Sequence, residues 1–203
     1  MKWGSSYRVG KYEYRRYSRS LWLKVFFHNM TTFVGFSSES EAKQCNSVYK
    51  YSILSELNGI QKQSNGKYEF ILEYPEHDSM NQWQQTNSPL EETEHGQKEV
   101  VGYKEIHIGE SSSKWGGLAK SSDAVKQYTL INGSPVDTTG MDWGFAIGMY
   151  NGVYWGHYNL PAGEHGATNI VYLWVKVPKI GCMTNIRCPY HNNLLFYISL
   201  AFS

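Results

Sequence analysis

Two runs of alternating side chains constrain the fold of this chain more than any other feature. Residues 68–74 read YEFILEY, with a large apolar side chain at every second position, and Pro75 ends the run. Residues 170–177 read IVYLWVKV and place four branched aliphatic side chains on one face. Successive side chains of a strand point to opposite faces of a sheet, so both runs predict β-strands. Because both faces are partly apolar, we expect a sheet packed on something on each side, or a sandwich.

Shorter alternating runs predict further strands. They lie at 21–27, 100–108, 128–131 and 142–149. In the first run, strict alternation would place Val25 and Phe27 on one face and Phe26 on the other.

One segment has a helical rather than an alternating period. Between residues 47 and 63 the apolar side chains recur at spacings of three and four, and Gly59 and the turn at 64–66 mark the end. A capping-box pattern at 38–41 predicts the start of a further short helix. We therefore predict a β-rich α+β domain, built as an antiparallel sheet or β-sandwich with one main helix, near 47–63, packed on it.

The chain divides into one globular domain and two appendages. Its 203 residues suffice for a domain that buries a core without metals or a disulfide framework. Residues 1–20 hold six basic residues and one acid, and we interpret them as a weakly ordered basic leader, with a nucleic-acid arm as the alternative. Residues 21–177 form the domain. Residues 178–203 form a cysteine-containing tail whose apolar end, 194–202, is too short to span a bilayer.

Charge and composition exclude some classes of partner and favour one class of domain. The chain has 19 Lys+Arg and 18 Asp+Glu, and the net charge of +1 argues against chain-wide attraction to nucleic acid or to an acidic membrane. Charged residues are only 18% and aromatic residues are 15%, with 19 glycines, a balance typical of a β-rich, ordered domain with an adhesive surface. No apolar run follows Met1, so the sequence as written shows no secretory signal.

The cysteines and sequons permit an extracellular location without requiring it. The chain has three cysteines, so at least one is unpaired or intermolecular, while Cys182 and Cys188 could bridge locally in an oxidising compartment. They are too few for a four-cysteine zinc site. Asn29 and Asn132 each begin an N-glycosylation triplet, a pattern that often arises by chance.

Catalytic signatures are missing from the sequence. There is no nucleophile elbow, no zinc-protease motif and no EF-hand loop, and the seven histidines are scattered. Glu69 and Glu73 alternate with apolar residues and look solvent-facing, so no carboxyl pair stands out for glycoside hydrolysis. Loop oxygens could hold calcium, but no spacing demands it. We predict no enzyme activity and no cofactor, with a hydrolase as the least favoured alternative.

The strongest functional signal is a set of aromatic and amide residues near glycines. The apolar faces of sugar rings pack on aromatic rings, and their hydroxyls pair with amides and carboxylates. The candidate glycan contacts are Trp83, Gln84, Asn87, Trp143, Tyr154, Trp155 and His157. Tryptophans also fill the cores of β-proteins. We expect that role for Trp22 and Trp174, and favour it for Trp83 and Trp143, whereas for Trp155 both roles are equally favoured.

Eight segments, taken in order, resemble a secreted domain of cnidarian extracellular proteins. They are residues 21–29, 51–54, 66–70, 73–76, 81–89, 115–118, 143–148 and 171–175. Some of those proteins are skeletal organic matrix proteins of stony corals, often with fibrinogen-like relatives. The family has no established reaction, so the resemblance implies an extracellular, non-enzymatic domain. The chain departs from the pattern at its unusual ends.

Together these observations predict an extracellular, non-catalytic binding or matrix module. Its partner would be a glycan or a matrix protein, held by loops around 82–87 and 143–157. The alternative is a structural matrix component whose partner is another copy of itself. We expect neither a nucleic-acid partner nor a membrane span.

Overall fold

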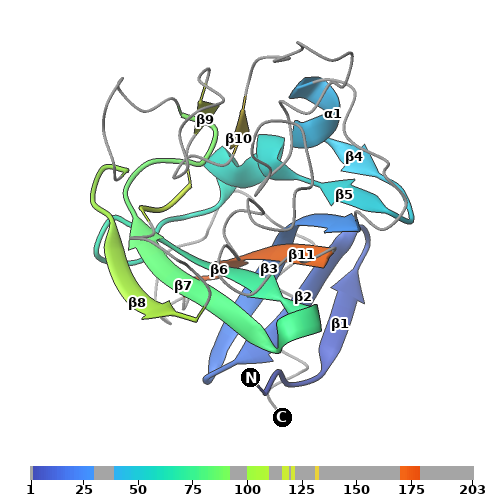
Figure 1. The fold of residues 1–203 in the computed structure, drawn as a ribbon, viewed down its shortest axis with the longest axis horizontal. Helices are drawn as coiled ribbons and strands as arrows, with labels where there is room; N and C mark the ends of the chain where they lie inside the picture. Colours follow the sequence, from blue (N-terminus) through green and yellow to red (C-terminus); the bar gives the residue numbers. More distant parts are fainter. Residues whose placement is uncertain are drawn as a thin grey trace, which may run out of the picture.

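The computed structural model describes residues 2–29, 39–91, 100–109, 116–118, 120–121, 131–132 and 170–178 (Figure 1). Strands dominate this part of the chain. The strands are β1 (Ser6–Val9), β2 (Tyr12–Tyr17), β3 (Ser20–Asn29), β4 (Cys45–Asn46), β5 (Lys50–Ser52), β6 (Tyr68–Tyr74), β7 (Ser79–Gln85), β8 (Lys104–Ile108), β9 (Lys120–Ser121), β10 (Ile131–Asn132) and β11 (Ile170–Lys176). The helices are the α-helix α1 (Glu39–Lys43) and the 3₁₀ helices η2 (Leu54–Gly59) and η3 (Pro75–His77).

Nine of the strands form one antiparallel sheet. Its main path runs β1-β2-β3-β11-β6-β7-β8. The last described strand, β11, therefore lies in the middle of the sheet, between β3 and β6. β2 pairs with the first part of β3 and β5 pairs with the second part, with β4 beside β5. β9 and β10 form a separate parallel pair.

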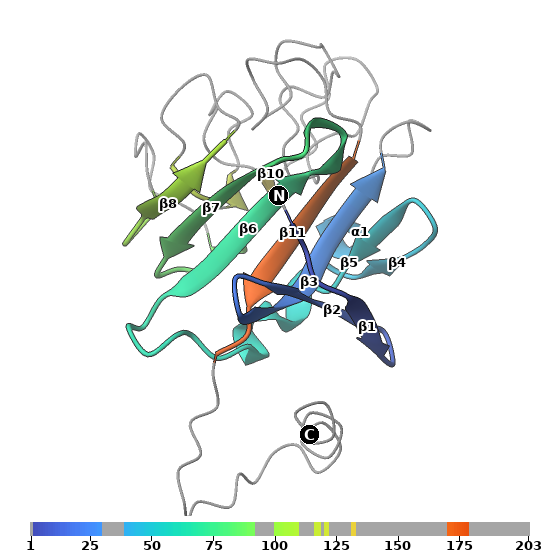
Figure 2. The same ribbon diagram turned by 90° about the horizontal axis from the view of Figure 1, so that it is seen from below.

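The two faces of the sheet have different packing. The face that we call the inner face carries the larger core, to which η2, α1 and residues 116–118 contribute buried side chains. Its members include Leu23, Val25, Phe26, Leu54, Leu57, Phe70, Leu72, Trp83, Leu118, Val171, Leu173 and Val175. The opposite, outer face carries a smaller buried cluster of Trp22, Ile71, Met80 and Trp174. Figure 2 shows the sheet from the outer face, with the N-terminal segment crossing in front of β11 and β3.

The strongest sequence patterns predicted their strands well. β6 occupies residues 68–74 as predicted, and β11 covers 170–176 of the predicted 170–177. The prediction at 21–27 corresponds to β3, and β8 covers the second half of the prediction at 100–108. Of the prediction at 128–131, only Ile131 is described, and it lies in β10. The predicted strand at 142–149 lies outside the described residues. A β-rich, antiparallel architecture is therefore confirmed.

A β-bulge corrects the predicted alternation in β3. The pairing of β11 with β3 shifts between Leu173 and Trp174, so β3 contains one extra residue at that point. Phe26 consequently joins the inner core with no exposed surface, while Phe27 stacks on Tyr172 at 5.1 Å between ring centroids. Strict alternation assigned these two rings to the wrong faces.

The predicted main helix at 47–63 is wrong. Residues 50–52 pair with β3, and only 54–59 are helical, as the 3₁₀ helix η2. Leu54 and Leu57, three residues apart, are both buried, a spacing that suits the three residues per turn of a 3₁₀ helix. Val48 is the first apolar residue of the helical pattern, which would place it on the buried side of the helix, but it is 82% exposed. The short helix expected near 38–41 is present as α1.

The predicted weakly ordered leader is also corrected. β1 and β2 form a hairpin within residues 6–17, and β2 pairs with β3. Upstream of it, the backbone N–H of Gly4 donates to the carbonyl of Arg16 at 2.8 Å. The folded sheet therefore begins well before residue 21. No helix in the described part of the chain is long and apolar enough to cross a membrane.

Candidate functional site

The outer face presents a layer of polar and charged side chains above an aromatic floor. Trp22 and Trp174 are at most 1% exposed, and Ile71, opposite Trp174 on β6, has no exposed surface. Trp3, from the N-terminal segment, packs on Trp174 with 4.9 Å between ring centroids, and on Tyr17 with 5.2 Å. Burial of Trp22 and Trp174 was predicted from their positions in strands, and the structure confirms it.

Three cations of the outer face share one buried carboxylate. Glu13 is 7% exposed, and its carboxylate lies 2.6 Å from Lys24 Nζ, 3.3 Å from Arg8 Nη2 and 3.5 Å from Arg15 Nη2. Burial alone would raise the pKa of Glu13, but the bond from Lys24 and the nearby guanidinium groups hold it below its usual value. Glu13 is therefore a fixed anion that keeps Lys24 and Arg15 in place.

The same cations lie over aromatic rings of β11. The Arg15 guanidinium is 5.0 Å from the Trp174 ring centroid and 6.0 Å from that of Tyr172. Lys24 Nζ is 5.4 Å from the Tyr172 ring centroid. Cations at these distances are attracted by the negative face of the ring. The result is a half-buried layer of rings and cations along β2, β3 and β11.

A second polar cluster surrounds Glu69 on β6. Its carboxylate accepts hydrogen bonds from the side-chain amides of Gln82 at 2.9 Å and Gln84 at 3.0 Å, both on β7. Lys176 Nζ, on β11, donates to both carboxylate oxygens at 3.0 and 3.1 Å. Gln84 also accepts a hydrogen bond from the amide of Asn65 at 3.1 Å. These contacts hold two half-buried amides in defined positions at the surface.

Glu73 is the third acid of the outer face. It is 5% exposed, and the indole N–H of Trp174 donates to its Oε2 at 2.7 Å. Burial raises the pKa of this carboxyl group, and the Trp174 bond and the charge of Arg15 oppose that shift only in part. Burial in the folded protein therefore disfavours the charged form of Glu73.

The expectation that Glu69 and Glu73 face solvent is wrong, since both are only 5% exposed. The side chains around them replace water as their partners. They do not, however, form a pair suited to glycoside hydrolysis. The two residues are four apart on one strand, which separates them by about 13 Å at the usual rise per residue, whereas the two catalytic carboxyls of glycosidases lie about 5–9.5 Å apart.

Of the predicted glycan contacts, the structure places Gln84 on the outer face and Trp83 in the core. Trp83 has no exposed surface, and its indole N–H donates to Gln85 Oε1 at 2.8 Å. The backbone carbonyl of Asn87 accepts from Gln85 Nε2 at 2.7 Å, so Asn87 also belongs to this internal network. The same amide of Gln85 bonds both backbone groups of Leu118, at 2.8 and 2.9 Å. The segment 82–87 is therefore divided between the two faces.

The other predicted contacts, Trp143, Tyr154, Trp155 and His157, lie outside the described residues, as do Cys182 and Cys188. Asn132 lies in β10, and Asn29 is a half-buried residue at the end of β3. Cys45 is a free, half-buried thiol whose pKa is raised by burial and by the nearby Glu41. The described ranges contain no group of three or more His, Cys, Asp or Glu side chains that could hold a metal ion.

Sequence reasoning missed most residues of the outer face. They are Glu13, Arg15, Lys24, Glu69, Tyr172 and Lys176. One signal was available: Tyr172, Trp174 and Lys176 alternate on one side of β11, opposite the aliphatic residues. Their acidic partners come from β2 and β6, strands distant in sequence, and local patterns do not reveal such pairings.

The comparisons with known proteins are negative. No family model, no curated protein and no solved structure matches the chain. The resemblance to cnidarian matrix proteins therefore stays a prediction.

Proposed function

We propose that the chain is a non-catalytic extracellular module that binds a glycan on the outer face of its sheet. One observation supports this most: the outer face combines half-buried aromatic rings on β3 and β11 with amides and charged groups, further along the sheet on β6 and β7, that are already held by hydrogen bonds. Tyr172 stacks with Phe27, and the amides of Gln82 and Gln84 are fixed on Glu69. Rings offer apolar faces to sugar C–H groups, and fixed amides bind hydroxyls at low entropic cost.

This proposal moves the site from the loops to a sheet face. Strands position side chains more accurately than loops do, and the neighbouring β3, β11, β6 and β7 supply a continuous surface. The surface carries only a small net charge, because Arg8, Arg15, Lys24 and Lys176 face Glu13, Glu69 and the buried Glu73. A face of this kind suits an uncharged sugar backbone.

The test is isothermal titration calorimetry of the full chain with chitohexaose, cellohexaose and laminarin, a neutral β-glucan. Tyr172→Leu keeps an apolar side chain in β11 but removes the ring, so we expect affinity to fall about fivefold to tenfold. Gln84→Ala should weaken binding through the lost amide.

Gln61→Ala is the matched control for Gln84→Ala, because Gln61 is an exposed amide that lies in none of the strands. It should leave affinity unchanged, and all variants should show normal thermal unfolding. If no sugar binds the folded wild-type chain, or if both glutamine variants behave alike, the outer face is not the glycan site. Concentration-dependent sedimentation of the wild type without any sugar would then favour the self-associating matrix component.

A further inference from the structure

Positive charge is concentrated at one end of this chain. Six of its 19 basic residues but only one of its 18 acids lie in residues 1–20, so this segment carries +5 and the remainder of the chain −4. Such asymmetry within a nearly neutral chain points to an interaction surface for an anionic partner.

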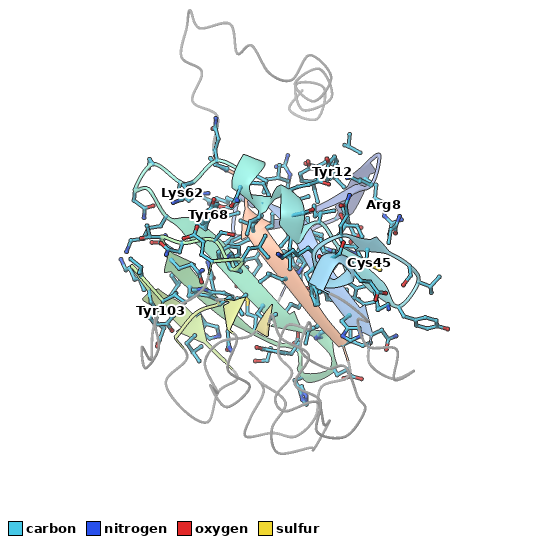
Figure 3. The ribbon with its side chains drawn as sticks, turned by 90° about the horizontal axis from the view of Figure 1, so that it is seen from above. Arg8, Tyr12, Cys45, Lys62, Tyr68 and Tyr103 are labelled. Atoms are coloured by element: carbon cyan, nitrogen blue, oxygen red, sulfur yellow. The ribbon has the colours of Figure 1, made fainter. Side chains whose placement is uncertain are left out.

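The structure turns this segment into an ordered, cationic hairpin at the edge of the sheet. Gly10, with φ of +60°, forms the turn between β1 and β2. The exposed cations of the segment are Lys2, Arg8, Lys11, Arg16 and Arg19. Its single acid, Glu13, is buried and already shared by three cations. Lys11 is ion-paired with Glu56 of η2, and the exposed charged side chains within residues 2–20 are all cations. Figure 3 shows Arg8 and Tyr12 of the hairpin on the opposite side of the molecule from Tyr68 and Tyr103.

One of these cations occupies a strained position. Ser18 and Arg19 form the two-residue turn between β2 and β3, with φ of +48° and +62°. Two-residue hairpin turns with both φ values positive strongly favour glycine or asparagine, because other residues clash with their own backbone there. Arginine at this point costs stability, and its side chain is exposed. A strained, exposed residue is explained if its side chain serves binding rather than folding.

We infer that the β1–β2 hairpin and its turns bind the sulfate or carboxylate groups of an anionic polysaccharide. This inference rests on the proposed function and specifies its ligand: a glycan that lies on the outer face and continues onto the hairpin, where Arg8 and Arg15 project on the same side. Guanidinium groups bind sulfate and carboxylate through paired N–H donors.

A nucleic acid is the competing polyanion, and the hairpin suits it less well. Proteins that hold single strands stack successive bases on several exposed rings. In the described hairpin Tyr7 is 38% exposed and stacks on Tyr14, while Tyr12, Tyr14 and Tyr17 are buried or half-buried. The exposed side chains are mainly cations, which contact charged groups without reading bases.

The experiment compares laminarin with laminarin sulfate, which share one backbone and differ in charge, by titration of the full chain at several salt concentrations. We expect the sulfate to bind at least tenfold more tightly than laminarin, with an affinity that falls as salt rises. Arg19→Gly should weaken sulfate binding about threefold to tenfold while raising the melting temperature by about 2–4 °C, because glycine relieves the turn. A purely structural role for Arg19 would not produce opposite changes in affinity and stability.

Two further variants test whether sulfate binding depends on the hairpin or on any positive charge of the protein. Arg8→Gln should weaken sulfate binding to a similar degree as Arg19→Gly. Lys104→Gln removes the same charge at the other edge of the sheet, on β8, and should leave the affinity within twofold of wild type. Equal losses in all three variants would overturn the assignment to the hairpin.

The outcomes also separate this inference from the proposed function. Equal affinity for both glucans overturns the inference and leaves outer-face glycan binding intact. Tight sulfate binding that Tyr172→Leu does not affect supports the hairpin and overturns the outer-face site. No binding of either glucan overturns the inference, and it overturns the proposed function as well only if chitohexaose and cellohexaose also fail to bind. Tighter binding of single-stranded poly(dT) than of laminarin sulfate, at equal charge concentration, overturns the polysaccharide in favour of nucleic acid.

Discussion

Replacement of Gln85 by leucine should destabilise the protein by about 4 kcal/mol. The Gln85 amide is fully buried and joins β7 to two other segments of the chain. Leucine has a similar volume, so the cost comes from hydrogen bonds rather than from a cavity. Two N–H donors, the indole of Trp83 and the backbone of Leu118, lose their acceptor. The carbonyls of Asn87 and Leu118 lose a donor. A buried polar group left without a partner costs about 1–3 kcal/mol, and the two N–H groups account for most of the total.

Chemical denaturation followed by circular dichroism measures this change as a shift of the midpoint at constant slope. A double-mutant cycle with Trp83→Phe tests the hydrogen bond between Gln85 and Trp83 directly. Phenylalanine removes the indole N–H, so Gln85→Leu should cost about 1–2 kcal/mol less in that background. A cost below about 1 kcal/mol, or strictly additive effects, would show that Gln85 does not bond Trp83 in the folded protein.

Three further changes test the packing of the two faces. Glu73→Gln should raise stability at neutral pH, because burial raises the pKa of Glu73 in the folded protein. The wild type therefore loses stability as the pH rises above the unfolded pKa of about 4.3. The variant should lack this loss in a pH series of denaturation curves. The pH dependence that comes from Glu13 has the opposite sign, because its lowered folded pKa gives stability above about pH 4.3 that is lost as the pH falls. Glu13→Gln should cost about 2 kcal/mol at pH 7, because Lys24 loses its carboxylate partner. A gain in stability would contradict the ion-pair assignment. Gly117→Ala should cost at least about 2 kcal/mol in the same assay, because the φ of Gly117 is +91° and the new Cβ would lie 2.5 Å from Val100 Cγ2. An unchanged denaturation midpoint would mean that this segment is packed differently.

The sequence predicted elements whose pattern is local and strong. β6 and β11 follow directly from alternation, since each strand lies in the middle of the sheet and must bury at least one face. The bulge in β3 was not predictable, because it depends on the register with β11, about 150 residues later in the chain. The helical spacing near 47–63 was overridden for the same reason: pairing of residues 50–52 with β3 outweighs local helical preference.

The candidate site was less predictable than the fold. Amides at 82 and 84 were visible in the sequence, but their partner Glu69 lies on a different strand and was assigned to solvent. Burial of an acid depends on which cations reach it, and Lys176 is more than 100 residues away from Glu69 in sequence. Glu13 likewise appeared as the lone acid of a basic leader, whereas the fold makes it the shared partner of three cations.

The edges of the sheet bear on the choice between glycan binding and self-association. β8 carries a bulge at Ile106 and charged neighbours, and β1 carries Arg8 with Lys11 in the adjoining turn, features that discourage pairing with another edge. Two copies that approach through the described hairpins would also repel each other. Salt screens this repulsion, so self-association through the hairpin would increase with ionic strength, whereas binding of a sulfated glycan would decrease. The sign of the salt dependence therefore distinguishes the two functions even before any variant is made.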